Sequence, residues 1–212
     1  MPAGVLERPP ARSAGDVLPP VAPPRPGDDD GGGHGLFGDT RRFGLLAFMG
    51  TVSMLFVGFT SAYIVRRASA DWRPLAAPPL LFVNTAVLLA SSATLEVARR
   101  RFLGWDLRGA QAFVGATGAL GLLFVAGQYG AWRVLAAQGV YLASNPHSSF
   151  FYMLTGLHAL HLLGGLVWFT TVGVRMRRMA YAPGTDALGL FALYWHFLSA
   201  LWLYLLYLLF VM

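Results

Sequence analysis

The sequence predicts an all-α integral membrane protein, a bundle of five transmembrane helices. Of its 212 residues, 56% are hydrophobic and 12% are charged, which is about half the charge of an average soluble domain. After residue 42 the apolar residues gather in five continuous stretches, each close to the roughly 20 residues that a spanning helix needs. Because these stretches do not alternate between apolar and polar residues, a transmembrane β-barrel is excluded.

Arginines and turn residues set the limits of the predicted spans. The first span, residues 43–65, lies between two arginine pairs, and the second, residues 78–98, begins with a proline pair and ends at an arginine run. Proline suits the first helical turn, where the N–H groups have no partner in the helix. The third span covers residues 110–131 between two arginines, the fourth covers 149–174, and the fifth covers 187–211 without a charged residue.

Glycines recur in the third and fourth predicted spans. Small residues let helices approach closely in a bilayer, so we expect close packing at these positions: Gly115, Gly118, Gly121, Gly156, Gly164 and Gly165.

Residues 1–40 form a separate segment. They hold three proline pairs, an aspartate run at 28–30 and a glycine run at 31–33. Such a segment buries too little apolar surface to offset the entropy of ordering it. We therefore expect a disordered segment at 1–40 and a membrane domain at 41–212.

The distribution of arginine predicts the orientation. Twelve of the 16 basic residues lie in the N-terminal segment and in the connections after the second and fourth spans, and four lie on the other side. Because cytoplasmic segments carry the excess of arginine, the N-terminus is predicted to be cytoplasmic and the C-terminus to be outside.

The composition also excludes several chemistries. The chain has no cysteine, and all of its basic residues are arginine. Iron–sulfur clusters, cysteine-ligated metals and lysine Schiff bases are therefore excluded. Taken alone, the formal net charge of +6 would favour a nucleic-acid partner. The apolar content indicates instead that the protein lies in a bilayer. No nucleic-acid partner is expected.

Few polar side chains lie inside the predicted spans, and such residues tend to be functional because burying them is costly. Three are histidines: His158 and His161 in the fourth span and His196 in the fifth. They could hold a haem or metal, or they could form hydrogen bonds between helices. We favour the second interpretation, with Ser91 and Ser92 of the second span as partners, and predict no catalytic or metal-binding residue.

Glu96 is the one carboxylate inside a predicted span. A lone carboxylate there could relay protons or bind an ion. It also lies within about a turn of Arg99 and Arg100, where it could form an ion pair at the membrane interface. We favour the ion pair.

Four motifs occur in order along the chain. They are AYIVRR at 62–67, NTAVLLASSATLEVA at 84–98, FFYMLTGLHALHLLGG at 150–165 and YWHFLSALWLYLLYLLF at 194–210. Together they resemble subunit III of the haem–copper cytochrome c oxidases, in its short five-helix bacterial form. The resemblance covers roughly residues 41–212 and marks these buried polar and motif residues: Asn84, Ser91, Ser92, Glu96, His158, His161, Trp195 and His196.

The resemblance implies an accessory subunit of an aerobic respiratory oxidase in the bacterial cytoplasmic (inner) membrane. Subunit III of that family binds no haem or copper, which lie in partner subunits. It packs on subunit I beside subunit II and a small subunit IV, holds phospholipid and supports proton uptake and sustained turnover. The electron donor to such a complex is cytochrome c or, in the alternative of a quinol oxidase, quinol.

The sequence departs from the family pattern at two positions. Many members carry a buried glutamate in the helix that ends with the AY motif, where this chain reads Thr51, Val52 and Ser53 with no carboxylate in the span. The usual aspartate after YWHF is also missing, and Ser199 stands in its place. A proton-collecting role based on those acids is therefore not expected.

Bound phospholipid is also expected from the arginines on the predicted cytoplasmic side, since arginine there attracts acidic lipid. The alternative is that they only set the topology. The candidates for lipid head groups are Arg99, Arg100, Arg101, Arg175, Arg177 and Arg178.

Two further classes of protein remain as alternatives. A free-standing transporter would be favoured by helices broken at mid-membrane, but every proline lies outside a span or at its end. A b-type cytochrome would use His158, His161 and His196 as haem ligands.

Overall fold

The computed structural model describes residues 40–178, 186 and 188–212, and all of the regular secondary structure in these residues is helical. The five helices are α1 (Thr40–Arg67), α2 (Pro79–Leu103), α3 (Leu107–Ala137), α4 (Pro146–Arg177) and α5 (Gly189–Phe210). Each is long and apolar enough to cross a membrane, which confirms the predicted fold class. The segment predicted to be disordered lies, except for Thr40, outside the described residues.

Helices α3 and α4 begin before their predicted apolar spans because polar residues cap their N-termini. Asp106 accepts a hydrogen bond from the Gly109 amide at 2.9 Å, so α3 begins three residues before the predicted span. Asn145 and Ser148 form a reciprocal capping box that begins α4 three residues early. Capping side chains satisfy the first N–H groups of a helix, and an apolar window misses them because they are polar.

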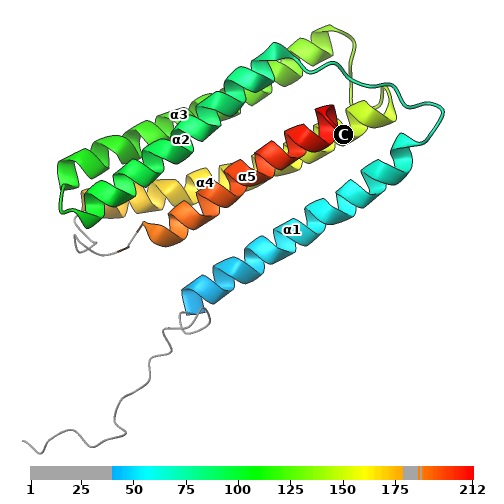
Figure 1. Ribbon diagram of the computed structural model, residues 1–212. Coiled ribbons are helices and arrows are strands. Elements are labelled where there is room, and N and C mark those ends of the chain that lie inside the picture. Colours follow the sequence, from blue (N-terminus) through cyan, green and yellow to red (C-terminus); the bar gives the residue numbers. More distant parts are fainter. Residues whose placement is uncertain (1–39, 179–185, 187) are drawn as a thin grey trace, which may run out of the picture.

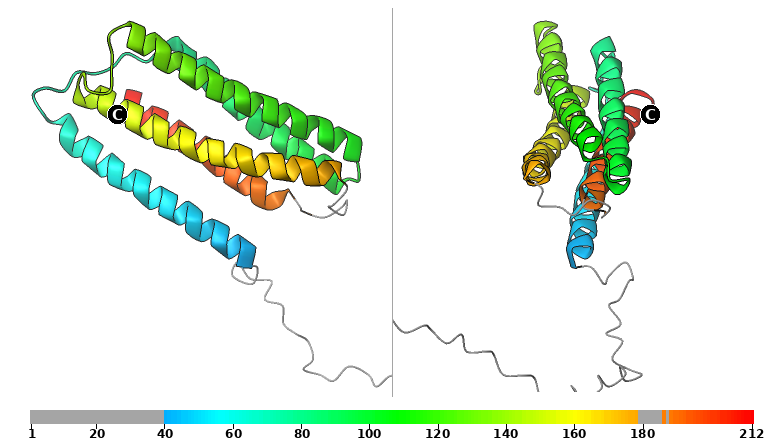
Figure 2. Two further views of the ribbon diagram at one scale, coloured as in Figure 1. Left: turned by 180° about the vertical axis from the view of Figure 1, so that it is seen from behind. Right: turned by 90° about the vertical axis from the view of Figure 1, so that its left-hand side faces the viewer.

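The helices form two closely packed pairs with α1 at the side (Figure 1). Helix α2 packs along α3, α4 packs along α5, and α2 and α3 also contact α5 and α4, respectively. The view from behind shows α1 separated from the α2–α3 pair by the other two helices (Figure 2). Within the described chain, the backbone of α1 approaches only α4 and α5. A hydrogen bond of 2.7 Å between the hydroxyls of Thr60 and Tyr204 joins α1 to α5.

The core is centred on the aromatic residues of α5. The largest fully buried side chains are Trp195 and Trp202. Trp202 meets the ring of Phe124 from α3 edge-on at a centroid distance of 5.1 Å, a favourable aromatic geometry. Helix α1 contributes least to the core, with Val52, Phe56 and Tyr63 as its buried residues. The face of α5 is therefore what the other helices pack against.

Close approach at glycine is confirmed at some of the predicted positions. A Cβ at Gly118 would lie 2.5 Å from the Phe169 ring of α4, and one at Gly121 would lie 3.0 Å from Trp195. Gly115 and Gly164 face open space, so the prediction was wrong for these two. At both positions a Cβ would have no heavy atom within 4 Å, so neither glycine is needed for a close helix contact in the described chain.

Candidate functional site

Hydroxyl groups of α2 accept hydrogen bonds from the buried tryptophans of α5. The indole N–H of Trp202 donates to Thr85 Oγ1 at 2.9 Å, and the indole N–H of Trp195 donates to Ser91 Oγ at 3.0 Å. Each hydroxyl in turn donates to a carbonyl one turn back in α2. An indole N–H can only donate, whereas a hydroxyl both donates and accepts, so every polar hydrogen of both pairs has a partner.

A third contact continues this series toward the end of the bundle where α2 ends. Ser92 Oγ and His196 Nδ1 lie 2.5 Å apart. Thr85 and Ser92 are seven residues apart, as are Trp195 and Trp202. Because seven residues make two helical turns, these side chains recur on the facing sides of two antiparallel helices. We call these three hydrogen bonds the α2–α5 ladder.

Asn84 joins α2 to α3. Its side-chain amide donates to the carbonyl of Phe124 at 3.0 Å and to Gln128 Oε1 at 3.4 Å. The neighbouring Gly127 leaves the space that the amide occupies, because a Cβ there would overlap the Asn84 oxygen. Asn84 and Gln128 are both buried, so this contact is internal to the chain.

His158 does not join the predicted hydrogen bonds. It is fully buried, and neither ring nitrogen has a hydrogen-bond partner in the described chain. Its ring lies against Trp202 at a centroid distance of 5.2 Å and against Phe124 at 6.2 Å. The expectation that His158, Ser91, Ser92 and His196 satisfy one another is wrong for His158, because Trp195 takes the place at Ser91.

His161 lies toward a different helix. Its Nδ1 donates to the Leu157 carbonyl at 2.7 Å, one turn back in α4. The ring contacts Phe48 and Phe56 of α1 at centroid distances of 6.3 and 6.1 Å. The three predicted histidines thus engage different neighbours, and residues 40–178, 186 and 188–212 contain no group of three histidine or acidic side chains placed to hold a metal.

Glu96 forms the expected ion pairs. Its carboxylate lies 2.8 Å from Arg100 Nε and 3.6 Å from the Arg99 guanidinium. Pairing at helical spacing near the end of α2 supports the interfacial interpretation over the proton relay. Glu96 and Arg99 also line a pocket of about 390 Å³, together with Arg42, Asp186 and His196.

Two arginines at the end of α2, Arg99 and Arg101, also pair with aspartates outside the helix. Arg99 binds Asp186 with both Nε and a terminal nitrogen, at 2.7 and 2.8 Å. This pairing holds the pKa of Asp186 below its usual range, despite partial burial. Arg101 binds Asp106 at 2.9 Å, and the Gly109 amide together with Arg101 lowers the pKa of Asp106. Of the six arginines predicted to bind lipid, these three are already paired within the chain.

The arginines at the end of α4 have a different setting. Arg175, Arg177 and Arg178 form no ion pair with another residue of the described chain. Arg177 borders a groove of about 240 Å³ between α3 and α4. Gln111 and Thr170 are polar members of its lining, and the others are apolar residues and glycines, among them Gly115 and Phe169. A cation at the end of a mostly apolar groove suits an anionic amphiphile.

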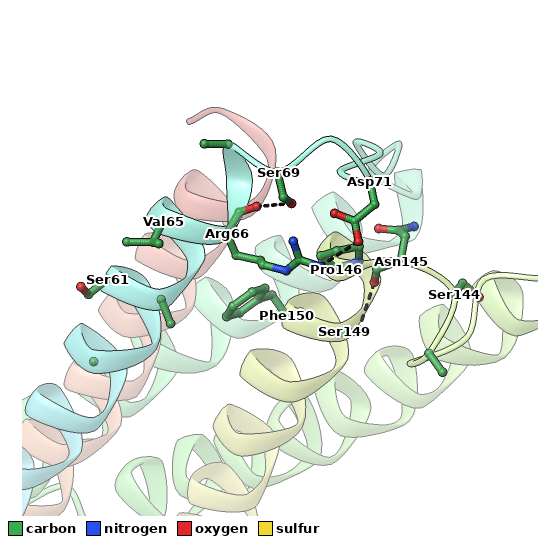
Figure 3. Close-up of a pocket in the computed structure, with 14 residues that line it drawn as sticks. Ser61, Val65, Arg66, Ser69, Asp71, Ser144, Asn145, Pro146, Ser149 and Phe150 are labelled. Carbon is green, nitrogen blue, oxygen red and sulfur yellow. Dashed lines mark hydrogen bonds and ion pairs between the residues drawn. The ribbon is translucent and has the colours of Figure 1, made fainter.

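The opposite end of the bundle has a larger pocket, of about 1160 Å³, between α1 and α4 (Figure 3). At its edge Arg66 reaches from the last turn of α1 to Asp71 in the connection to α2, at 2.7 Å. Asn145 and Phe150 form the side that belongs to α4 and its cap. Arg66 and Phe150 lie in two of the motifs found in the sequence, whereas Asp71 and Asn145 lie outside them.

Two kinds of contact were missed by the sequence-based prediction. The contact of Thr85 with Trp202 has a signal in the sequence. A second hydroxyl residue, Ser92, follows Thr85 by seven residues, and Trp202 follows a second tryptophan, Trp195, by seven residues. His147, which lies beside the connection from α1 to α2 and binds the Leu75 amide, has no such signal. Its partners lie 62 and 72 residues away in the chain, so only the fold brings them together.

Comparison with known proteins identifies the family. The family model described as Cytochrome c oxidase subunit III matches residues 32–212. A cytochrome c oxidase subunit 3 from Synechocystis sp. is 34% identical over 182 residues, which cover 82% of this chain and 77% of the relative. One from Thermostichus vulcanus is 31% identical over 82% of this chain and 88% of its own length. A probable cytochrome c oxidase subunit 3 from Nocardia farcinica is 32% identical over 76% and 82% of the two chains. The motifs of α2, α4 and α5, the five spanning helices and these matches agree: the chain belongs to the cytochrome c oxidase subunit III family.

Proposed function

We propose that this chain is the accessory subunit III of a haem–copper terminal oxidase in the bacterial cytoplasmic membrane. The observation that carries the proposal is the family match over residues 32–212, in which the motif residues Ser91 and Trp195 make a buried contact between helices. The proposed orientation places the N-terminus in the cytoplasm and the C-terminus outside, following the arginine distribution.

The proposed role is structural support of partner subunits rather than chemistry. The polar residues of the ladder are used in hydrogen bonds within the chain, which leaves them no evident part in electron transfer. Haem and copper would lie in subunit I and subunit II, next to which this chain and a small subunit IV would pack. The complex would take electrons from cytochrome c, or from quinol if it is a quinol oxidase.

Helix α1 supports the proposal of a partner surface. Large apolar side chains on its outer face are exposed, among them Met54, Val57 and Val65 at 79%, 63% and 74%. Such a face must lie against lipid or another subunit. We propose that α1 meets both in the assembled oxidase.

Lipid retention is the second part of the proposed role. The groove beside Arg177 offers an arginine and a mostly apolar lining, which match the head group and acyl chain of an anionic phospholipid. We therefore place the proposed lipid site at the end of α4. The support for sustained turnover and proton uptake would follow from holding subunit I in an intact lipid environment.

Purification of the complex through a tag on this chain, in mild detergent, tests the proposal. The expected result is a co-purified complex with haem and copper and oxygen-reducing activity. The same chain, stripped of its partners, should be colourless. A haem band in stoichiometric amount on the single chain would support a b-type cytochrome instead, and purification of an active transporter without oxidase subunits would overturn the proposal.

A further inference from the structure

His147 joins three parts of the chain at the end of the bundle where α1 ends. It is buried in the first turn of α4, with an exposed fraction of 2%. The backbone N–H of Leu75, in the connection from α1 to α2, donates to its Nδ1 at 2.8 Å. Its Nε2 lies 3.0 Å from the Leu209 carbonyl at the end of α5. Trp72 of the same connection stacks on the ring, with the centroids 5.0 Å apart and the planes 14° from parallel.

These partners determine which proton the imidazole carries. A backbone N–H can only donate and a carbonyl can only accept. Nδ1 must therefore be free of a proton, and Nε2 must carry one. Only the neutral Nε2–H form makes both hydrogen bonds. If the ring took up a second proton, on Nδ1, the Nδ1–H and the Leu75 N–H would point at each other, and the bond to Leu75 would break.

Among the described residues, the charged side chain that acts on the ring is Arg67 of α1. From α1 the Tyr63 ring also faces it at a centroid distance of 6.0 Å, and from α5 the Phe210 ring at 6.3 Å. The connection contributes Trp72 and the backbone of Arg73. The Arg73 and Leu209 backbone contacts favour a protonated ring, whereas burial, the largest influence, disfavours it. An imidazolium here would thus have a like charge as its charged neighbour.

Trp72 and Asp71 attach the first part of the connection through ring contacts and an ion pair, and the bond from Leu75 to His147 attaches the part that follows. Residues 73–78 have no regular secondary structure. The same connection supplies Ser69 and Asp71 to the wall of the large pocket between α1 and α4 (Figure 3). Since the backbone of α1 approaches only α4 and α5 in the described chain, the attachment of this connection helps to decide how firmly α1 is held.

We propose that His147 is an acid-sensitive latch: in its neutral form it holds the α1–α2 connection onto α4 and α5, and protonation of Nδ1 releases the connection and loosens the wall of the α1–α4 pocket. If the orientation proposed above is correct, this end faces the outside of the cell, so the latch would respond to acid there. The latch itself does not depend on that orientation, because its partners are all within this chain.

The sign of the pH dependence follows from linkage. The latched form excludes the proton, so its stability is fully present above the ordinary imidazole pKa and is lost as the pH falls below it. The opening equilibrium should therefore rise by up to about tenfold for each pH unit below about 6.5.

Hydrogen–deuterium exchange on the intact oxidase complex in detergent tests the latch, since detergent exposes both ends of the bundle to the same buffer. After correction for the intrinsic pH dependence of exchange, protection of the Leu75 amide should fall about tenfold between about pH 7.5 and about pH 5.5. Peptides from the core of α2 serve as the internal reference and should keep their protection. Equal protection of Leu75 at both pH values would overturn the proposal, without bearing on membership of the oxidase.

Three variants separate the latch from a general effect of acid. His147→Asn keeps an oxygen acceptor for the Leu75 amide but cannot be protonated there, so its protection should not change with pH. His147→Phe keeps a ring to stack on Trp72 but has no acceptor, so the connection should be unprotected at both pH values. Tyr63→Phe is the matched control and should keep the pH dependence of the wild type. An acid response in His147→Asn as large as that of the wild type would also contradict the latch.

Discussion

The indole nitrogen of Trp202 lies 2.9 Å from the hydroxyl oxygen of Thr85, across the contact between α5 and α2. Trp202 is fully buried, so its N–H has no access to lipid head groups or water. The hydroxyl is held in place by its own hydrogen bond to the Leu81 carbonyl at 2.7 Å. One small side chain of α2 therefore permits a large, donor-bearing side chain at the centre of the bundle.

Replacing Thr85 by valine keeps the shape of the side chain but leaves the Trp202 N–H without an acceptor. We expect Thr85→Val to destabilise the complex by about 1–2 kcal/mol, the cost of stranding a polar group inside a membrane bundle. Thermal dissociation of the detergent-solubilised oxidase measures this. Thr171→Val is the control, because Thr171 is exposed and its hydroxyl bonds to a carbonyl of its own helix. If the two variants had equal effects, the interhelical bond would not contribute to the stability of the complex.

His196 should contribute to assembly through its bond to Ser92 rather than to electron transfer. His196→Leu loses this bond and should lower the yield of assembled oxidase, at a cost on the order of 1–2 kcal/mol, with little change in the turnover of the complexes that do form. His196→Asn offers a new polar group near Ser92 and should recover part of the yield. Full assembly of His196→Leu with immediate loss of turnover would instead indicate a direct role in proton movement.

Gly127 of α3 should tolerate a side chain poorly. Gly127→Ala forces the Asn84 amide to move and should destabilise the chain by about 1–3 kcal/mol, as overpacking does in other cores. Gly164→Ala is the control, since that position faces open space and alanine favours helix. The two variants can be ranked by unfolding in denaturant, and equal stability would contradict the tight α2–α3 contact.

The ion pair of Arg99 with Asp186 should make one end of the bundle sensitive to strong acid. Because the folded pKa of Asp186 is lowered, its contribution is present above the unfolded pKa of about 3.9 and is lost as the pH falls through the folded value. More than a third of the Asp186 side chain is exposed, so we expect Asp186→Asn to cost less than about 1 kcal/mol. The difference in melting temperature between the two proteins should shrink as the pH falls below about 4, and a constant difference would argue against the ion pair.

Anionic lipid should depend on Arg177 more than on Arg101. Arg177 borders a groove, whereas Arg101 is paired with Asp106. A near-surface arginine adds about 1 kcal/mol of attraction to acidic lipid, so Arg177→Gln should retain anionic lipid about fivefold more weakly. Native mass spectrometry after mild delipidation measures the retained lipid, with Arg101→Gln as the control. If both variants kept the lipids of the wild type, the arginines would serve only to set the topology.

Several local features could be predicted because their cause lies within a short stretch of sequence. Glu96 and Arg100 are four residues apart on one helix, and they form the expected ion pair. By contrast, His158 and His161 are three residues apart but contact different helices. Spacing places residues on a helix face, but it does not say which neighbour that face meets.

The sequence by itself determined the five helices, their approximate limits and the family. Length, apolar content and motifs depend only on the order of the residues along the chain. Only the tertiary structure decided that Trp195 rather than His158 binds Ser91, and that His147 joins the Leu75 amide to the end of α5. Hydrogen bonds are directional and have a range of about 3 Å. Which donor reaches which acceptor therefore depends on how whole helices pack, and helix packing is set by many side chains at once.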